Sequence, residues 1–252
     1  TDTVITNNNR DTASSHTVTI DAKDKDDKVE VTLKDVNIDA SSRSEAAVSV
    51  TGKGDTTIEL DGDNELKSGA GHAGLEHNKT DTSGELTIQD KDKNGSLEAA
   101  GGFKGAGIGS AGSNDAQVKI TGGNITATSD DWGAGIGSGS EKGCSNIVIE
   151  SGTITAKGGD LGAGIGGGQL AAGQNITIRD GNVTAIPGRE AAGIGGGNRG
   201  DGKNITIERG TVYAESGGGN GPAAAIGGGR WTGEGENIKI TGGNVTLKTV
   251  DD

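Results

Sequence analysis

A short glycine-rich element recurs along the chain at a nearly constant spacing. Its first regular copy reads G-A-G-I-G, and the central isoleucines of five copies are separated by 28, 29, 29 and 32 residues. A degenerate copy, His72–Glu76, places Leu75 33 residues before Ile108. A period of this size is typical of solenoids, in which each repeat buries its apolar face against its neighbours. The regular copies are Gly105–Gly109, Gly133–Gly137, Gly162–Gly166, Ala191–Gly195 and Ala223–Gly227.

Each repeat also contains three pairs of apolar residues, and one residue separates the members of a pair. Because successive side chains of a strand point to opposite faces, each pair predicts a short strand with two side chains toward the core. Four residues join the second and third strands, which is too short for a helical crossover. The third of these four is always glycine, which predicts a turn with positive φ. These turn glycines are Gly123, Gly152, Gly181, Gly210 and Gly243.

The pattern predicts an all-β fold, a right-handed parallel β-helix with coils of about 29 residues and three short strands each. We expect the β-helix to span residues 29–247, with regular repeats from residue 105, in about seven coils that each add roughly 4.8 Å. Residues 1–28 are expected to form an N-terminal cap or an irregular first coil. Residues 248–252, after Leu247 in place of the usual alanine, are expected to close the other end. The chain opens at Thr1 without methionine, as a processed or excised segment would.

Composition narrows the function classes. The 252 residues include 50 glycines, only 2% aromatic residues and 36 acidic against 23 basic residues, a net charge of −13. Phosphate recognition needs a basic surface, so nucleic acid is excluded as a partner. No apolar run is long enough for a transmembrane helix, so no membrane insertion is expected. The single cysteine, Cys144, allows no internal disulfide.

Asparagine and glycine are each expected to form columns along the stacked coils. Asparagine precedes the second strand in four successive repeats, and such residues bond from coil to coil when they stack. Glycines that alternate with the inward residues, such as Gly107 and Gly135, leave two interpretations open. They either relieve crowding between coils or form a strip of bare backbone that a flat ligand can approach. The asparagines are Asn146, Asn175, Asn204 and Asn237.

The few aromatic residues mark a candidate ligand site. Aromatic rings on loops stack on sugar faces, while nearby charged groups bond the hydroxyls. The alternative is that these rings only cover the edges of coils. The candidate ligand-binding residues are Trp132, Trp231, Tyr213, Asp130, Asp131 and Arg230.

A second candidate site is a calcium loop. Asp90, Asp92 and Asn94 stand in the order D-x-D-x-N-G, which opens an EF-hand calcium loop. The twelfth position, where calcium loops carry glutamate, is Gly101. A solvated turn is the alternative, and no other cofactor is expected.

Catalysis is poorly supported by the sequence. The three histidines lie in the less regular half, and the acids are scattered through turns rather than gathered on one face. We therefore expect no catalytic residues.

An outward threonine column suggests ice binding as a minor alternative, although Tyr213 interrupts it. The column consists of Thr126, Thr155, Thr184 and Thr246.

The chain resembles the glycine-rich parallel β-helical modules of large surface proteins in Gram-positive bacteria. The resemblance rests on Leu60–Glu76 and on the G-A-G-I-G-G-G units followed by N-I-T-I and G-N-V-T-A, and it covers roughly residues 29–252. It implies a secreted, adhesin-like binding module at the bacterial cell surface, with polysaccharide or a host glycan as its ligand. Alternatives are a spacer or stalk, a module that binds a host protein, and an enzyme similar to polysaccharide lyases.

Overall fold

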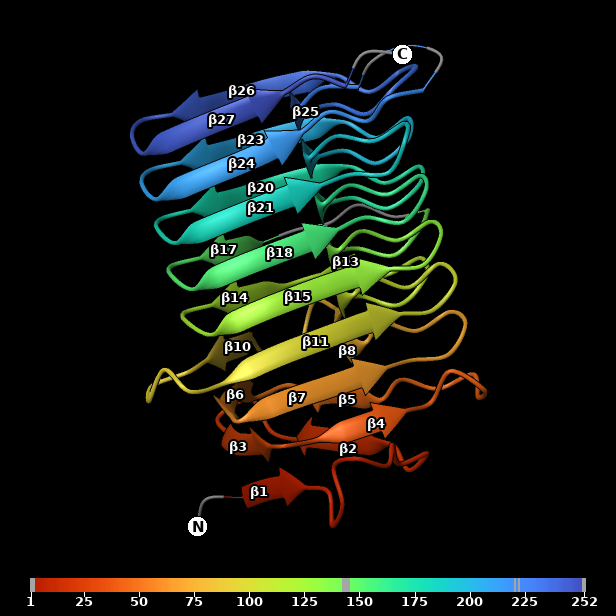
Figure 1. Cartoon of the computed structure of the whole chain (residues 1–252), viewed down its shortest axis with the longest axis vertical. Coiled ribbons are helices and arrows are strands. Elements are labelled where there is room, and N and C mark those ends of the chain that lie inside the picture. Colours follow the sequence, from red (N-terminus) through yellow and green to blue (C-terminus); the bar gives the residue numbers. More distant parts are fainter. Residues whose placement is uncertain (1–2, 142–145, 220, 222, 251–252) are drawn as a thin grey trace.

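The chain winds into a parallel β-helix bounded by three sheets (Figure 1). A computed structural model describes residues 3–141, 146–219, 221 and 223–250. The sheets have nine, eight and eight strands, one or two more than the seven coils predicted, because residues before position 29 join the same stack. Neighbouring strands within each of these sheets are parallel, for example β17 and β20. No helix in the described ranges is long and apolar enough to cross a membrane.

Sheet A consists of β1 (Thr3–Thr6), β3 (Lys28–Lys34), β6 (Asp55–Asp61), β10 (Leu86–Gln89), β14 (Val118–Ile120), β17 (Ile147–Ile149), β20 (Gly173–Ile178), β23 (Gly202–Ile207) and β26 (Gly235–Ile240). Sheet B consists of β4 (Asn37–Asp39), β7 (Asp63–Lys67), β11 (Ser96–Gly101), β15 (Asn124–Ser129), β18 (Thr153–Lys157), β21 (Asn182–Ile186), β24 (Thr211–Glu215) and β27 (Asn244–Lys248). Sheet C consists of β2 (Val18–Ala22), β5 (Val48–Gly52), β8 (Leu75–Glu76), β12 (Ile108–Gly109), β16 (Ile136–Gly137), β19 (Ile165–Gly166), β22 (Ile194–Gly195) and β25 (Ile226–Gly227). A short antiparallel pair, β9 (Asn78–Lys79) and β13 (Asp115–Ala116), lies outside them.

The core is a set of straight side-chain columns. The glycine-rich elements pair in register, so that Ile108, Ile136 and Ile165 lie directly above one another. All three are fully buried. Burial of such a side chain contributes about 1.5–3 kcal/mol, and a shift of one residue would turn the whole column outward. The predicted parallel β-helix with coils of about 29 residues is therefore confirmed.

The turn glycines between sheets A and B have the predicted backbone conformation. Their φ angles are 100° at Gly123, 109° at Gly152, 111° at Gly181, 91° at Gly210 and 90° at Gly243. A β-carbon on Gly181 would also lie only 2.9 Å from the carbonyl oxygen of Gly152 in the coil below. Both the dihedral angle and the close coil spacing therefore require glycine here.

Of the two interpretations of the alternating glycines, the exposed strip of backbone is wrong, because these glycines are buried. The amide of Ala134 donates to the carbonyl of Ser138 at 3.0 Å, which folds the G-A-G-I-G element back on itself. A β-carbon on Gly135 would lie 2.6 Å from the amide nitrogen of Lys157, and one on Gly109 would collide with the carbonyl oxygen of Gly137. The glycines thus let neighbouring coils approach each other, which is the crowding alternative.

The asparagine ladder exists, and it lies on the surface. The side-chain amide of Asn204 donates to Asn175 at 3.2 Å, and that of Asn237 donates to Asn204 at 2.7 Å. These residues are exposed and have φ between 52° and 55°. Asparagine tolerates this left-handed conformation better than other non-glycine residues, which explains its recurrence as each strand of sheet A begins.

The two ends of the rod differ from the interior. At the N-terminal end, β1 and β2 join sheets A and C, and Ser14 forms a bridge with Ile38 of sheet B, so residues 3–22 contribute to all three sheets. At the C-terminal end, Leu247 is 50% exposed, and residues 248–250 do not cover it. Cys144 and the last two residues of the expected closing segment lie outside the described residues.

We predict that Gly181→Val destabilises the protein much more than Thr184→Val, which introduces the same side chain three residues later on the outer face. The strained φ alone costs about 1–3 kcal/mol, and the contact with Gly152 adds to it. Thermal unfolding followed by circular dichroism should show a midpoint several degrees lower for Gly181→Val only. Equal midpoints for the two variants would contradict the assigned role of the turn.

Candidate ligand-binding surface

Two loops of each coil form a continuous edge along the rod, which we call the loop edge. One loop leads from sheet B to sheet C and the other from sheet C to sheet A, and both project on the side opposite the short turns (Figure 1). They are joined by backbone hydrogen bonds. The amide of Gln169 donates to the carbonyl of Trp132 at 2.7 Å, and the amide of Arg230 donates to the carbonyl of Glu190 at 3.0 Å. The loops are therefore a bonded extension of the solenoid.

The tips of the loops between sheets C and A form a column in the left-handed backbone conformation. The φ angles are 78° at Glu141, 61° at Leu170, 62° at Arg199 and 78° at Trp231. Backbone bonds connect the tips, as in the bond of 3.0 Å from the Arg199 amide to the Arg230 carbonyl. Leu170 is 51% and Trp231 63% exposed. Bulky residues with positive φ are uncommon, and their strain is often found at functional sites.

A second aromatic group lies on the neighbouring loops between sheets B and C. The rings of Phe103 and Trp132 have centroids 4.6 Å apart and are tilted by 53°. The Lys104 ammonium lies 5.0 Å from the Trp132 centroid and pairs with Glu141 at 3.0 Å. Phe103 is 38% exposed, whereas Trp132 is half-buried beside it. Phe103 is thus the more accessible ring, and the sequence did not single it out as a ligand-binding residue.

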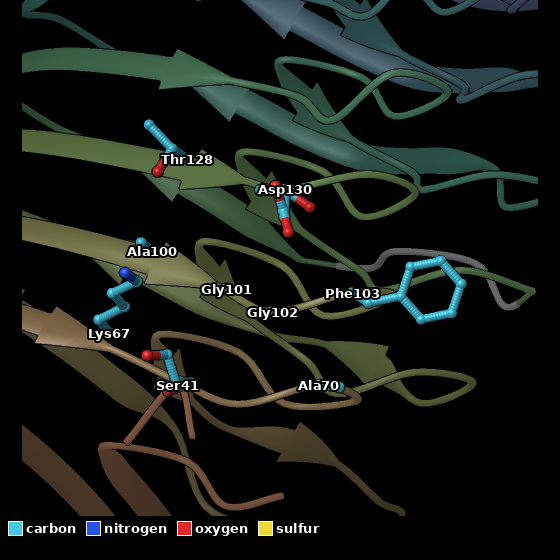
Figure 2. Close-up of a pocket in the computed structure, with 11 residues that line it drawn as sticks. Ser41, Lys67, Ala70, Ala100, Gly101, Gly102, Phe103, Thr128 and Asp130 are labelled. Atoms are coloured by element: carbon cyan, nitrogen blue, oxygen red, sulfur yellow. The ribbon is translucent and has the colours of Figure 1, made fainter. Parts of the chain in front are cut away.

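A groove of about 420 Å³ adjoins Phe103. It crosses the ends of β7, β11 and β15, where Lys67, Ala100 and Thr128 are paired in register. Figure 2 shows Lys67 and Thr128 on the strands and Asp130 and Phe103 on the adjoining loops. Asp130 is exposed, and the Lys67 ammonium forms a long ion pair of 3.9 Å with Asp39. The groove therefore combines an aromatic end with charged and hydroxyl groups that are open to solvent.

The structure separates the other predicted ligand residues. Asp131 is half-buried, and its carbonyl accepts the Leu161 amide at 3.1 Å. The Arg230 guanidinium, whose side chain is only 10% exposed, pairs with Glu190 at 2.9 Å and lies 4.1 Å from the Trp231 ring centroid. Arg230 therefore orients Trp231 and ties two loops together, which leaves little of it for a ligand.

Tyr213 lies away from the loop edge. It stands between Thr184 and Thr246 on the outer face of sheet B, as its in-register pairing shows. Its hydroxyl donates to Glu215 at 2.6 Å, and this hydrogen bond raises the pKa of the phenol. Of the six predicted residues, only Asp130 lines the groove, while Trp132 packs beside Phe103, Arg230 packs against Trp231, and Asp131 and Tyr213 lie apart from both groups.

The residues of the expected calcium loop hold their own turn together. The two carboxylate oxygens of Asp90 accept the amides of Asn94 at 3.1 Å and Gly95 at 3.2 Å. The Asn94 side chain donates to Asp61 at 3.2 Å, and Asp92 is exposed. Within the described ranges, no group of three or more His, Cys, Asp or Glu residues could hold a metal ion. Calcium at Asp90, Asp92 and Asn94 stays a prediction.

One buried histidine lies in the less regular half. His77 is 3% exposed, and its Nδ1 lies 3.1 Å from the carbonyl oxygen of Gln117. Burial lowers the pKa of His77 below its ordinary value, against the opposing effect of the bond to Gln117. The folded protein therefore favours the neutral imidazole.

We predict that stability falls as the pH drops below about 6.5, the ordinary pKa of histidine. The unfolded chain then binds a proton that folded His77 resists, so the free energy of unfolding falls by at most about 1.4 kcal/mol per pH unit until the lower folded pKa is reached. Urea unfolding at several pH values should show a shallower dependence for His77→Gln. His16→Gln, at an exposed position, should keep the wild-type slope, and the same slope in His77→Gln would contradict the assignment.

For the calcium loop, we predict that Asp90→Ala lowers the unfolding midpoint without calcium, because two amides lose their acceptor. Asp92→Ala should leave that midpoint unchanged. If calcium binds, the wild-type midpoint rises with its concentration, and Asp92→Ala loses this rise. Unchanged midpoints and no heat of binding at millimolar calcium would rule the site out.

Comparison with known proteins agrees with this architecture. Four segments of the chain match the family model described as a beta helix repeat, at residues 118–140, 147–169, 176–198 and 205–230. No curated protein and no solved structure matches the chain. Each matched segment begins in sheet A and ends in the loop between sheets C and A, so the family repeat and the structural coil coincide.

Proposed function

We propose that the chain is a non-catalytic module that binds polysaccharide or a host glycan along its loop edge, displayed outside a bacterial cell. The observation that carries the proposal is the pair of Phe103 and Trp132 beside a groove with exposed charged and hydroxyl groups. Sugars present an apolar face to aromatic rings and a rim of hydroxyls to polar side chains. The resemblance to adhesin-like surface modules supports the expected location.

The shape of the surface favours an extended ligand. The groove crosses three strands of sheet B, and Trp231 presents a second exposed ring further along the same edge. Lys67, Thr128 and Asp130 offer donors and acceptors within the groove. The ligand would therefore contact loop tips and side chains, rather than the buried glycine backbone that the sequence suggested.

The carboxyl groups with a displaced pKa have structural partners. A carboxyl group that acts as a general acid has a raised pKa. The pKa is displaced in Asp39, Asp201 and Glu150, and in each it is lowered. Hydrogen bonds lower it in Asp39 and Asp201, and in Glu150 the pairs with Lys119 and Arg179 outweigh burial. These groups stabilise the coils in their ionised form.

A glycan array with the soluble chain should identify a ligand, and substitutions at the loop edge should then weaken its binding. We predict that Phe103→Ala combined with Trp132→Ala, and separately Trp231→Ala, each lower the affinity roughly fivefold or more, because truncation of an aromatic anchor costs more than about 1 kcal/mol. The measurement is isothermal titration calorimetry on variants that keep the wild-type unfolding midpoint.

Tyr213→Phe is the matched control, because it removes one hydroxyl from the face of sheet B and should leave the affinity unchanged. Unchanged binding in both loop-edge variants would show that the ligand binds to another face of the rod. Binding to a host protein but to no glycan would favour the protein-binding alternative, and no binding at all would favour a spacer.

A further inference from the structure

The floor of the groove beside Phe103 is bare, because the coil that forms it carries only small residues there. Ala100 has the smallest side chain of the outward column of sheet B that also contains Lys67 and Lys157. Gly101 and Gly102 follow it, and a β-carbon on either glycine would collide with a neighbouring carbonyl oxygen. The stacking of the coils therefore requires a floor without large side chains at this point of the rod.

The coils on either side of this floor supply walls of opposite charge. Lys67 lies on one wall, and Thr128 and Asp130 lie on the other (Figure 2). Lys67 and Thr128 both pair in register with Ala100, so their strands are two strand spacings apart, about 10 Å. Phe103 lies where the floor continues into the loop. The groove thus has a cationic side, an anionic side and an aromatic end.

The Lys67 ammonium is accessible to a ligand. Its side chain is 53% exposed, and its distance of 3.9 Å from the Asp39 carboxylate exceeds the length of a hydrogen bond. The Asp39 carboxylate accepts the amide of Ser41 at 2.9 Å, and hydrogen bonds from Ser41 are the main cause of its lowered pKa. Asp39 is therefore held by Ser41, and Lys67 can donate hydrogen bonds to a second carboxylate.

We propose that the groove binds a sugar that carries a carboxylate, as uronic acids and sialic acids do. This inference rests on the proposed function of the loop edge, and it names the class of sugar that the groove takes. The carboxylate pairs with Lys67, hydroxyls of the same or the next sugar donate to Asp130, and an apolar ring face contacts Phe103.

The two charged walls favour an acidic sugar over a neutral one. Any sugar has hydroxyls that can donate to Asp130, whereas only an anionic group gives Lys67 a hydrogen bond in which both partners are charged. The net charge of −13 repels an acidic glycan from the rod as a whole. The pair with Lys67 therefore also confines such a glycan to the groove.

Isothermal titration calorimetry with two acidic probes, sialyllactose and trigalacturonic acid, tests the proposal. Their neutral counterparts are lactose and galactotriose. The wild-type chain should bind at least one acidic probe more tightly than its counterpart, and the probe that binds distinguishes a host glycan from a polysaccharide as the source. Lys67→Gln should reduce this preference roughly fivefold or more. Lys157→Gln makes the same change in the same column outside the groove, and it should keep the wild-type preference.

A second variant tests the floor. Ala100→Gln places a longer uncharged side chain across the groove, so it should weaken binding of the acidic probe roughly fivefold or more. Ile186→Gln introduces the same side chain further along the same column and should leave the affinity unchanged. All four positions face outward on sheet B, and circular dichroism would verify that each variant keeps the wild-type unfolding midpoint.

Two results would overturn the proposal in different ways. Equal affinities for the acidic and neutral probes, or a preference that survives Lys67→Gln, would refute the acidic class of sugar and leave the proposed function standing. No binding of any glycan, on a broad array as well as in calorimetry, would refute the proposed function together with this inference.

Discussion

Parallel hydrogen bonding between coils in strict register is the interaction on which the structure depends. It places Ile136 under Ile165 and fixes the distance at which neighbouring backbones pass one another. At that distance a β-carbon on Gly109 or Gly166 would collide with the next coil, so glycine is required where strands are shortest and backbones closest. The high glycine content is thus a consequence of the register. A chain with few large apolar side chains obtains its core from repetition.

The same register explains how much of the fold could be predicted from the sequence. The period of the isoleucines and the fixed place of Gly181 in its turn are local and repeated, so they predicted the coils and the turn conformation correctly. The interpretation that Gly135 is exposed was wrong, because strand alternation predicts the side on which a residue lies but not what packs against that side. The end of β18 and the neighbouring coil lie against that face, with the Lys157 amide nitrogen 2.6 Å from a β-carbon placed on Gly135, and no sequence pattern expresses this contact.

The candidate site was predicted less completely, because it joins residues from several coils. Asp130 was identified by residue type, but the groove is also lined by Lys67 and Phe103 from earlier coils. Their proximity follows from the coil lengths before residue 105, which are irregular. Arg230 was predicted to contact a ligand, yet it pairs with Glu190, which lies 40 residues earlier in the sequence.

The column of loop tips suggests how surfaces of this kind diversify. Glutamate, leucine, arginine and tryptophan occupy equivalent positions in four consecutive coils, and all have the same left-handed backbone conformation. Backbone bonds from the amides of Glu141, Leu170 and Arg199 hold three of these tips, so the position of the side chain there is set independently of its identity. A substitution at a loop tip can therefore change the surface of the rod one coil at a time, without disturbing the backbone hydrogen bonds between coils.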